Sequence, residues 1–173
     1  MDVDSTALSG IWWRHVAAGR DVYDQPPHAA HNRWQRGTVV EALYFADCEE
    51  TVWAEWYRYL AEAGLPPARA LPRDLWRWEI SLAVVADLRD DERLDRVGLP
   101  SPKPTRLQWP VFQPVGEQLH RDGWPALVSA SAARPEGQTL CVFRTAREVA
   151  GTRPMPPPTT VEEPPVIPTG MQT

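Results

Sequence analysis

Residues 39–64 read VVEALYFADCEETVWAEWYRYLAEAG and contain both kinds of element from which the fold is predicted. The apolar run 39–46 is short and bounded by polar or turn residues, which is typical of a strand. Apolar side chains then recur every four residues from Val52 to Leu60. This spacing predicts a helix with one apolar face over about 48–63.

The sequence also marks the two ends of this helix. Asp47 and Glu50 have the three-residue spacing of a capping box, which predicts the start. Gly64 and Pro66 predict the end. Glu55 falls on the side of the helix opposite the apolar face, where a solvated glutamate is the ordinary expectation.

Further strands and helices are predicted on both sides of this stretch. The expected strands cover 12–16, 76–82, 126–130 and 139–144, and the expected helices 90–97 and 110–123. Strands and helices do not alternate as βαβ units, so an α+β fold is favoured over a doubly wound parallel sheet. We expect a compact single domain of small, mainly antiparallel sheets packed with a few helices.

The composition changes near residue 150. Seven of the 19 prolines fall within the last 23 of the 173 residues. Such a segment is not expected to form a regular core element. The sequence therefore predicts a folded domain over 1–150 and an extended or disordered Pro-rich tail over 151–173.

Charge and hydropathy exclude several classes of protein. The net charge is -5, whereas proteins that bind nucleic acid through its phosphates are usually basic, so no direct nucleic-acid contact is expected. The longest run without a charged residue or histidine, Gly123 to Ala133, is shorter than the roughly 20 residues of a membrane span. The N-terminus has no signal-peptide pattern, and we expect a cytoplasmic protein.

Metal and disulfide sites are not predicted. Cys48 and Cys141 are the only cysteines, too few for a disulfide framework or a four-cysteine zinc site. His28 and His31 have a spacing that could hold a metal, but no cysteine or carboxylate cluster lies beside them. Arginine supplies almost all the basic charge, which raises the expectation of an anionic ligand, although codon bias is the favoured explanation of this feature taken alone.

Several polar residues stand out among the aromatic segments. Taken singly, each has an ordinary explanation: Arg14 as a charge on an edge strand, Tyr44 as a core residue, Glu55 as a helix surface residue and Ser131 as a turn serine. Glycine-rich phosphate loops, nucleophile elbows and zinc-protease motifs do not occur. The order and spacing of these polar residues are therefore the remaining signal.

The sequence resembles the RES family, named after its Arg, Glu and Ser. The matching motifs, in order, are WRH at 13–15, NRWQ at 32–35, LYFA at 43–46, AE at 54–55 and SAAR at 131–134. Together with the apolar strand that follows, they span about residues 11–145. No single motif is specific, but five in order at compatible spacing favour membership.

This resemblance implies a fold like that of ADP-ribosyltransferases and an NAD-consuming bacterial toxin. Such an enzyme splits the nicotinamide–ribose bond and passes ADP-ribose to inorganic phosphate, water or a protein. It also implies an Xre-type antitoxin partner with a helix-turn-helix region that occludes the site. NAD is then a substrate, no metal is required, and a homo-oligomer is compatible with the sequence.

The residues that carry the resemblance suit this chemistry. Glu55 is the candidate to stabilise an oxocarbenium-like ribose, and Arg14, with Arg33 as a second candidate, to bind the diphosphate. Tyr44 is the candidate to stack on nicotinamide. Ser131 is expected to orient the substrate by hydrogen bonding rather than to act as a nucleophile, because no adjacent base is evident.

Two departures from the family pattern leave alternatives open. Asn32 stands in place of a glycine, and Gln35 in place of an asparagine. Asparagine tolerates positive φ better than most residues, so the turn is expected to form. The alternatives are a RES-fold binding module that has lost catalysis and a protein-directed ADP-ribosyltransferase.

Overall fold

The long strands are the frame on which the rest of the chain packs. A computed structural model describes residues 1–23 and 30–172. Its strands are β1 (Ser5–Ala17), β2 (Glu41–Ala46), β3 (Arg73–Leu88), β4 (Ala126–Ala130), β5 (Gln138–Arg144) and β6 (Thr152–Val161). Its α-helices are α1 (Glu49–Ala63), α2 (Asp91–Arg96) and α3 (Trp109–Arg121), with short 3₁₀ turns at Pro67–Arg69 and Arg106–Gln108.

All six strands belong to one curved sheet. Their order is β1-β2-β5-β4-β3-β6, and β1 also pairs with β3. The strands β1, β2, β5, β4 and β3 therefore form a closed ring of paired strands, with β6 added at the outside of β3. The pairs are antiparallel except β3 with β4. The α+β class and the mainly antiparallel pairing are thus confirmed, with the strands in a single sheet rather than several small ones.

The core lies inside this curved sheet. Trp78 and Ile80 alternate with solvent-facing residues along β3 and are essentially fully buried. Phe45 from β2 packs edge-to-face on Trp78, with ring centroids 4.9 Å apart. The predicted strand 76–82 thus lies within β3, which extends beyond it at both ends, and its alternating side chains form a buried face.

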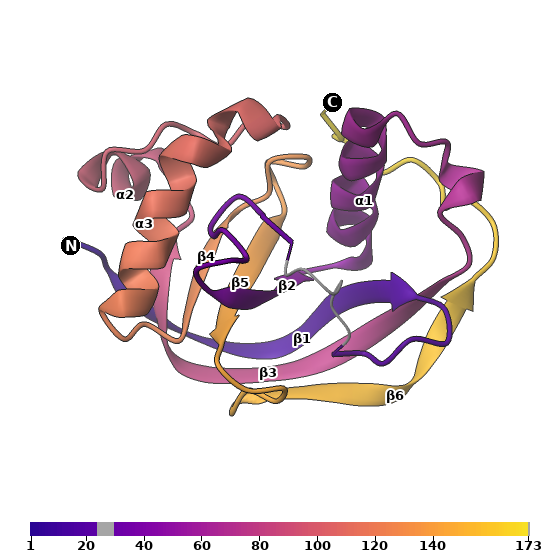
Figure 1. Cartoon of the computed structure of the whole chain (residues 1–173), viewed down its shortest axis with the longest axis horizontal. Helices are drawn as coiled ribbons and strands as arrows, with labels where there is room; N and C mark the ends of the chain where they lie inside the picture. Colours follow the sequence, from indigo (N-terminus) through magenta and orange to yellow (C-terminus); the bar gives the residue numbers. More distant parts are fainter. Residues whose placement is uncertain (24–29, 173) are drawn as a thin grey trace.

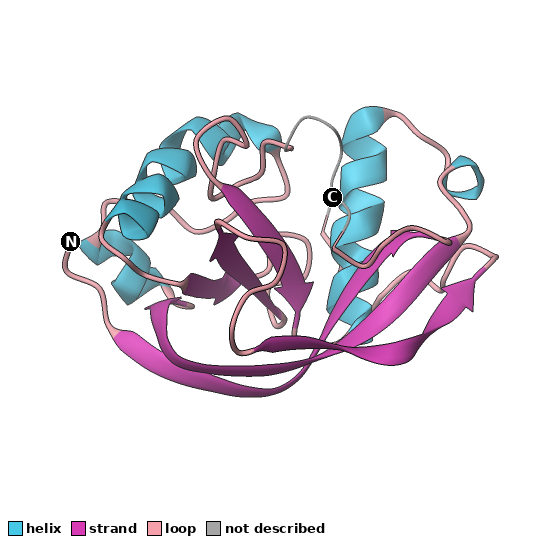
Figure 2. Ribbon diagram, turned by 60° about the horizontal axis from the view of Figure 1, so that its bottom comes forward, coloured by secondary structure: helices cyan, strands magenta, loops and turns pink. Residues whose placement is uncertain are grey.

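The helices form two groups on the same side of the long strands (Figures 1 and 2). Helix α1 packs its apolar face, which includes Trp53, Trp56 and Leu60, against Leu75 of β3. Helices α2 and α3 cover the other part of the sheet, where Phe112 is buried. The two groups leave α1 facing the start of α3 across the ends of the shorter strands (Figure 1).

Helix α1 starts and ends close to the predicted residues, but the capping box is wrong. The N-cap residue is Cys48, in an extended conformation, and its side chain makes no capping hydrogen bond. The helix ends at Gly64, whose φ of 63° is left-handed, a conformation that glycine adopts without strain.

The Pro-rich C-terminal segment corrects the predicted domain boundary. Thr152–Val161 is strand β6, paired antiparallel with β3 from Ile80 back to Arg73. Proline is tolerated on an edge strand because only alternate N–H groups are needed for pairing there. The segment is extended, as predicted, but it belongs to the sheet and is not a tail outside the domain.

Candidate functional site

A cavity of about 300 Å³ opens where β1 and β2 separate. Among the described residues, these strands pair only at Trp13 and Ala46, whereas β1 stays paired with β3 as far as Ala17. Side chains of both strands and of α1 line the space that results. The loop before β2, Trp109 at the start of α3, and Ala130, Ala132 and Thr139 around the turn between β4 and β5 also line the cavity.

The residues singled out in the sequence come together here. Arg14 on β1, Arg33 in the loop, Tyr44 on β2 and Glu55 on α1 all line the cavity. Ser131 follows β4 and reaches the same place through a hydrogen bond to Glu55. Five residues spread over 118 positions of sequence, from 14 to 131, thus belong to one cluster.

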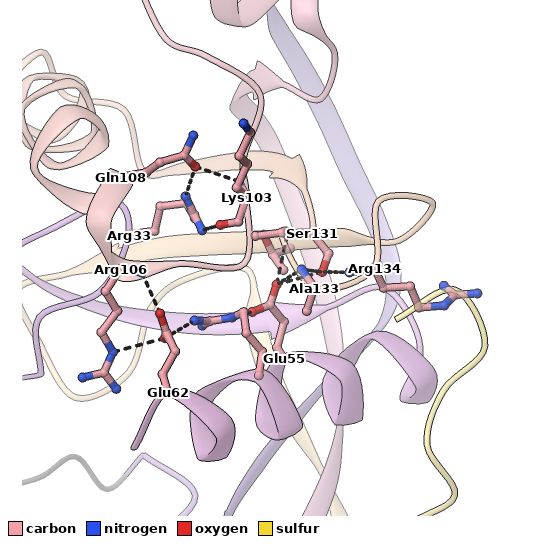
Figure 3. A network of polar contacts seen from close by, with 12 residues as sticks. Arg33, Glu55, Glu62, Lys103, Arg106, Gln108, Ser131, Ala133 and Arg134 are labelled. Atoms are coloured by element: carbon pink, nitrogen blue, oxygen red, sulfur yellow. Dashed lines mark hydrogen bonds and ion pairs between the residues drawn. The ribbon is translucent and has the colours of Figure 1, made fainter. Parts of the chain in front are cut away.

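The carboxylate of Glu55 accepts four hydrogen bonds (Figure 3). Its Oε1 accepts from Ser131 Oγ at 2.7 Å and from the backbone N–H groups of Ala132 at 3.1 Å and Ala133 at 3.3 Å. Its Oε2 accepts from Arg58 Nε at 2.9 Å. A carboxylate has about four lone-pair sites, so Oε2 keeps one for a ligand.

These donors keep Glu55 ionised. Burial by itself raises the pKa of this carboxyl group, since only 25% of the side chain is exposed. The charge of Arg58, the Ser131 hydroxyl and the Ala133 N–H outweigh burial and lower the pKa below its usual 4.5. Glu55 is therefore negatively charged at neutral pH, on the helix side that faces the cavity rather than open solvent.

Ser131 holds the turn as well as the carboxylate. Its hydroxyl donates to Glu55 and accepts from the N–H groups of Ala133 at 3.2 Å and Arg134 at 3.0 Å. The side chain is only 1% exposed. This geometry suits a residue that positions Glu55, and it leaves the hydroxyl proton committed to a carboxylate.

Arg14 has few hydrogen-bond partners, in contrast to Glu55. Its Nη1 donates to the backbone carbonyl of Tyr44 at 3.3 Å, while its Nε is buried without a partner. Burial, followed by the positive charges of Arg144 and Arg73, lowers the pKa of Arg14 to about 10. The half-buried Arg14 guanidinium has no carboxylate partner in the described part of the chain, an arrangement that suits an anionic ligand.

Arg33 offers a second cation to the cavity. Its hydrogen bonds go to neutral oxygens, from Nη2 to the Lys103 carbonyl at 2.5 Å and from Nη1 to Gln108 Oε1 at 3.2 Å. Its guanidinium carbon lies 5.0 Å from the centre of the Phe112 ring. Burial lowers the pKa of Arg33 to about 10, and these contacts fix the group without neutralising it.

Tyr44 is a neutral ring held in place by Gln35. Its hydroxyl donates to Gln35 Oε1 at 2.8 Å, and Gln35 Nε2 donates to the Ala30 carbonyl at 3.0 Å. Burial raises the pKa of Tyr44 well above 10. Asn32 closes the same turn by donating its N–H to the Gln35 carbonyl at 2.9 Å, without a positive φ.

A known protein family matches most of this chain. The family model of the RES domain matches residues 11–164. The chain belongs to the RES family. Because the match extends past residue 150, the RES domain includes β6, which supports the corrected boundary.

One solved structure similar to this RES protein is the crystal structure of the M. tuberculosis MbcT–MbcA toxin–antitoxin complex. The TM-score is 0.76 at 20% identity, over 91% of this chain and 86% of the matched chain. At this identity the likeness shows a shared fold. The comparison with curated proteins gives no match.

Two cavity residues of this RES protein were not predicted. Arg58 binds Glu55 and also donates from Nη1 to Glu62 at 2.6 Å, and its i,i+3 spacing from Glu55 was a usable signal. His15 accepts from Arg73 at Nδ1, 2.7 Å from Arg73 Nη2, and stacks on Trp53. No local sequence pattern predicts the contact between His15 and Arg73, because 58 positions separate the two residues.

The remaining predictions concern metals, cysteines and membranes. His28 lies outside the described residues, so its position relative to His31 is not given. Within residues 1–23 and 30–172, no cluster of three His, Cys, Asp or Glu side chains is arranged to hold a metal ion. Cys141 is buried and Cys48 half-buried, both as free thiols. None of the described helices has the length and apolar character needed to cross a bilayer.

Proposed function

We propose that this RES protein consumes NAD by breaking the nicotinamide–ribose bond, and that it acts as a toxin. The observation that carries the proposal is the placement on the walls of one cavity of an ionised Glu55 and of a half-buried Arg14 that has no carboxylate partner among the described residues. NAD presents a cationic nicotinamide riboside and an anionic diphosphate. The two sides of the cavity complement these charges.

Glu55 acts on the developing positive charge. Nicotinamide leaves with the electron pair of the C1′–N bond and becomes neutral, so no general acid is required. The ribose acquires oxocarbenium character, which a nearby carboxylate stabilises. The remaining acceptor site of Oε2 suits a ribose hydroxyl, and the four donors hold the carboxylate in one orientation.

Arg14 and Arg33 hold the diphosphate, and Tyr44 supports the leaving ring. Both guanidinium groups retain their charge inside the cavity wall. Arginine binds phosphate oxygens bidentately, which fixes position as well as charge. The neutral aromatic face of Tyr44 suits a planar nicotinamide.

The acceptor completes the reaction at C1′. Inorganic phosphate forms the new C1′–O bond through an anionic oxygen and yields ADP-ribose 1″-phosphate. Water forms the same bond but must also lose a proton to solvent. Dependence of turnover on added phosphate therefore distinguishes a phosphorylase from a glycohydrolase.

The decisive experiment measures nicotinamide release from NAD, with and without phosphate, for the wild type and Glu55→Gln. We expect release by the wild type and a loss of at least about 100-fold in kcat for Glu55→Gln, since it removes the charge that stabilises the transition state. NAD affinity should stay nearly the same, because Arg14 and Arg33 are intact.

The matched control for this experiment is Glu79→Gln. Glu79 is an exposed residue of β3, paired with Arg153 of β6, and lies outside the cavity lining. Its substitution should leave kcat unchanged. Turnover by Glu55→Gln at the wild-type rate would contradict the role of Glu55, and a folded wild type without release in either buffer would contradict the proposed function.

A binding module without catalysis is the second candidate. The observation that favours it is the amide of Gln35, which is committed to Tyr44 and Ala30 rather than free for a ligand. Retained NAD binding without nicotinamide release would support this candidate. Transfer of label from NAD to a protein would instead indicate a protein-directed ADP-ribosyltransferase.

We also propose an antitoxin partner that covers the cavity. The matched chain belongs to a toxin–antitoxin complex, and this chain shares its fold. Co-expression of the protein with a protein encoded beside it tests the proposal. A complex that releases no nicotinamide, from components that are active after separation, would support it.

A further inference from the structure

The chain that follows β6 returns to the turn that holds Glu55. We call residues 162–172 the C-terminal strap. Tyr57 on α1 donates its hydroxyl to the Pro165 carbonyl, and Arg134 Nε donates to the Thr169 carbonyl at 3.3 Å. The N–H of Gln172 then donates to the Ala133 carbonyl at 2.7 Å. The strap passes alongside α1 and ends beside it (Figures 1 and 2).

One peptide unit links the strap to the site. The carbonyl of Ala133 and the N–H of Arg134 belong to the same peptide group. The carbonyl accepts from Gln172, and the N–H donates to Ser131 Oγ at 3.0 Å. Hydrogen bonds on the two sides of a peptide polarise each other, so the Gln172 bond strengthens the donor that holds Ser131.

Arg134 ties the strap to the first turn of α1 as well. Besides Thr169, its guanidinium contacts Thr51 Oγ1 at 3.3 Å. Thr51 itself is fully buried and lies against Gly137, where an added Cβ would come within 2.1 Å of Thr51 Oγ1. The turn between β4 and β5 is thus held by α1 on one side and by the strap on the other.

We propose that the C-terminal strap is a positioning element of the site, which fixes the Ser131–Arg134 turn and through it the Glu55 carboxylate. This inference rests on the proposed NAD cleavage for its effect on turnover. The strap contacts Ala133 and Arg134, and neither Gln172 nor Thr169 lines the cavity. Its effect should therefore fall on the orientation and pKa of Glu55 rather than on NAD binding.

The test compares Gln172→Pro with Gln172→Ala. Proline lacks the N–H that binds the Ala133 carbonyl, whereas alanine keeps it and removes only the side chain. We expect kcat to fall about fivefold in Gln172→Pro, the usual effect of one hydrogen bond, with KM nearly unchanged. The acidic limb of the pH profile should move to higher pH, because looser donors lower the pKa of Glu55 less. Gln172→Ala should behave as the wild type.

Amide hydrogen exchange separates the strap from the proposed function. The N–H of Arg134 should exchange faster in Gln172→Pro than in Gln172→Ala, whether or not the protein cleaves NAD. Tyr57→Phe, which removes the contact to Pro165, should act in the same direction.

Equal exchange in the two Gln172 variants would overturn the proposal. The proposal would also be overturned if the Arg134 N–H exchanged faster in Gln172→Pro while kcat and the pH profile of an active protein stayed unchanged. A wild type that does not cleave NAD, with faster exchange in Gln172→Pro, would overturn the proposed function and leave the structural role of the strap supported.

Discussion

Glu55 and Arg14 line one cavity, yet their surroundings differ in kind. Glu55 accepts four hydrogen bonds, which lower its pKa despite burial. Arg14 donates to one carbonyl, and its buried Nε has no partner among residues 1–23 and 30–172. The comparison shows that the fold already satisfies its anion but leaves its cation unsatisfied. A satisfied anion suits an electrostatic role in catalysis, while an unsatisfied cation suits the binding of a ligand anion.

The largest expected effect on binding comes from removing the cation. Arg14→Met keeps most of the apolar length of the side chain and loses its charge. We expect the affinity for NAD to fall about 10- to 100-fold, as expected for the loss of a hydrogen bond to a charged group. Isothermal titration calorimetry measures this directly, with Arg153→Met as the control, because Arg153 is an exposed residue of β6.

The thermal stability of Arg14→Met is a second test of the difference between Glu55 and Arg14. Because burial and two neighbouring arginines disfavour the charge of Arg14, the free protein should gain stability when that charge is removed. The unfolding midpoint of Arg14→Met should rise by a few degrees in the absence of ligand. A lower midpoint together with unchanged NAD affinity would show that Arg14 is a structural residue.

A smaller effect is expected from removing a hydrogen-bond donor to the Glu55 carboxylate. Ser131→Ala removes one donor to Glu55 and leaves the N–H groups of Ala133 and Arg134 without their shared acceptor. We expect a loss of about 1–3 kcal/mol in the free energy of unfolding. The control is Ser129→Ala, which removes a buried hydroxyl next to Thr139 outside the Glu55 cluster.

The pH dependence of Ser131→Ala has a defined sign. The pKa of Glu55 is depressed in the fold, so its stabilisation is present above the unfolded value and is lost as pH falls through the folded value. Loss of the Ser131 donor raises the folded pKa toward the usual 4.5. The acidic limb of nicotinamide release should move to higher pH, and an unmoved limb would show that Ser131 does not act on Glu55.

The sequence predicted the local features of this molecule well. Helix α1 begins and ends within about one residue of its predicted bounds, because a four-residue apolar repeat and Gly64 are local signals. Strand β6 was missed because its prolines argue against a core element, while an edge strand beside β3 accepts them.

The site was predicted only as far as short motifs extend. The motifs supplied Arg14, Tyr44, Glu55 and Ser131, but not which of their charges would be neutralised. That depends partly on contacts between distant residues, such as Ser131 with Glu55, which no sequence period encodes. Periodicity identifies the polar side of α1 but does not show whether that side faces solvent or a cavity, so the position of Glu55 in the cavity was not predicted from the helix pattern.

The smallest expected effect concerns His15, a cavity residue whose neutral ring borders the charged groups of Arg73 and Arg14. The guanidinium of Arg73 can only donate, so His15 Nδ1 accepts and the ring proton lies on Nε2. Burial, followed by the charges of Arg73 and Arg14, lowers the pKa of His15 well below 6.5. Keeping this ring neutral costs stability as the pH falls below 6.5, because the unfolded chain binds the proton more readily.

Arg73→Gln sharpens this last point, since glutamine can still donate to Nδ1 but carries no charge. We expect the pKa of His15 to rise toward 6.5 without reaching it, because burial, the larger cause, remains. Nitrogen-15 NMR of the imidazole reports both the tautomer and the titration. A wild-type His15 that titrates near 6.5 would show that burial and the charges of Arg73 and Arg14 do not lower its pKa. A ring protonated on Nδ1 would contradict the hydrogen bond from Arg73.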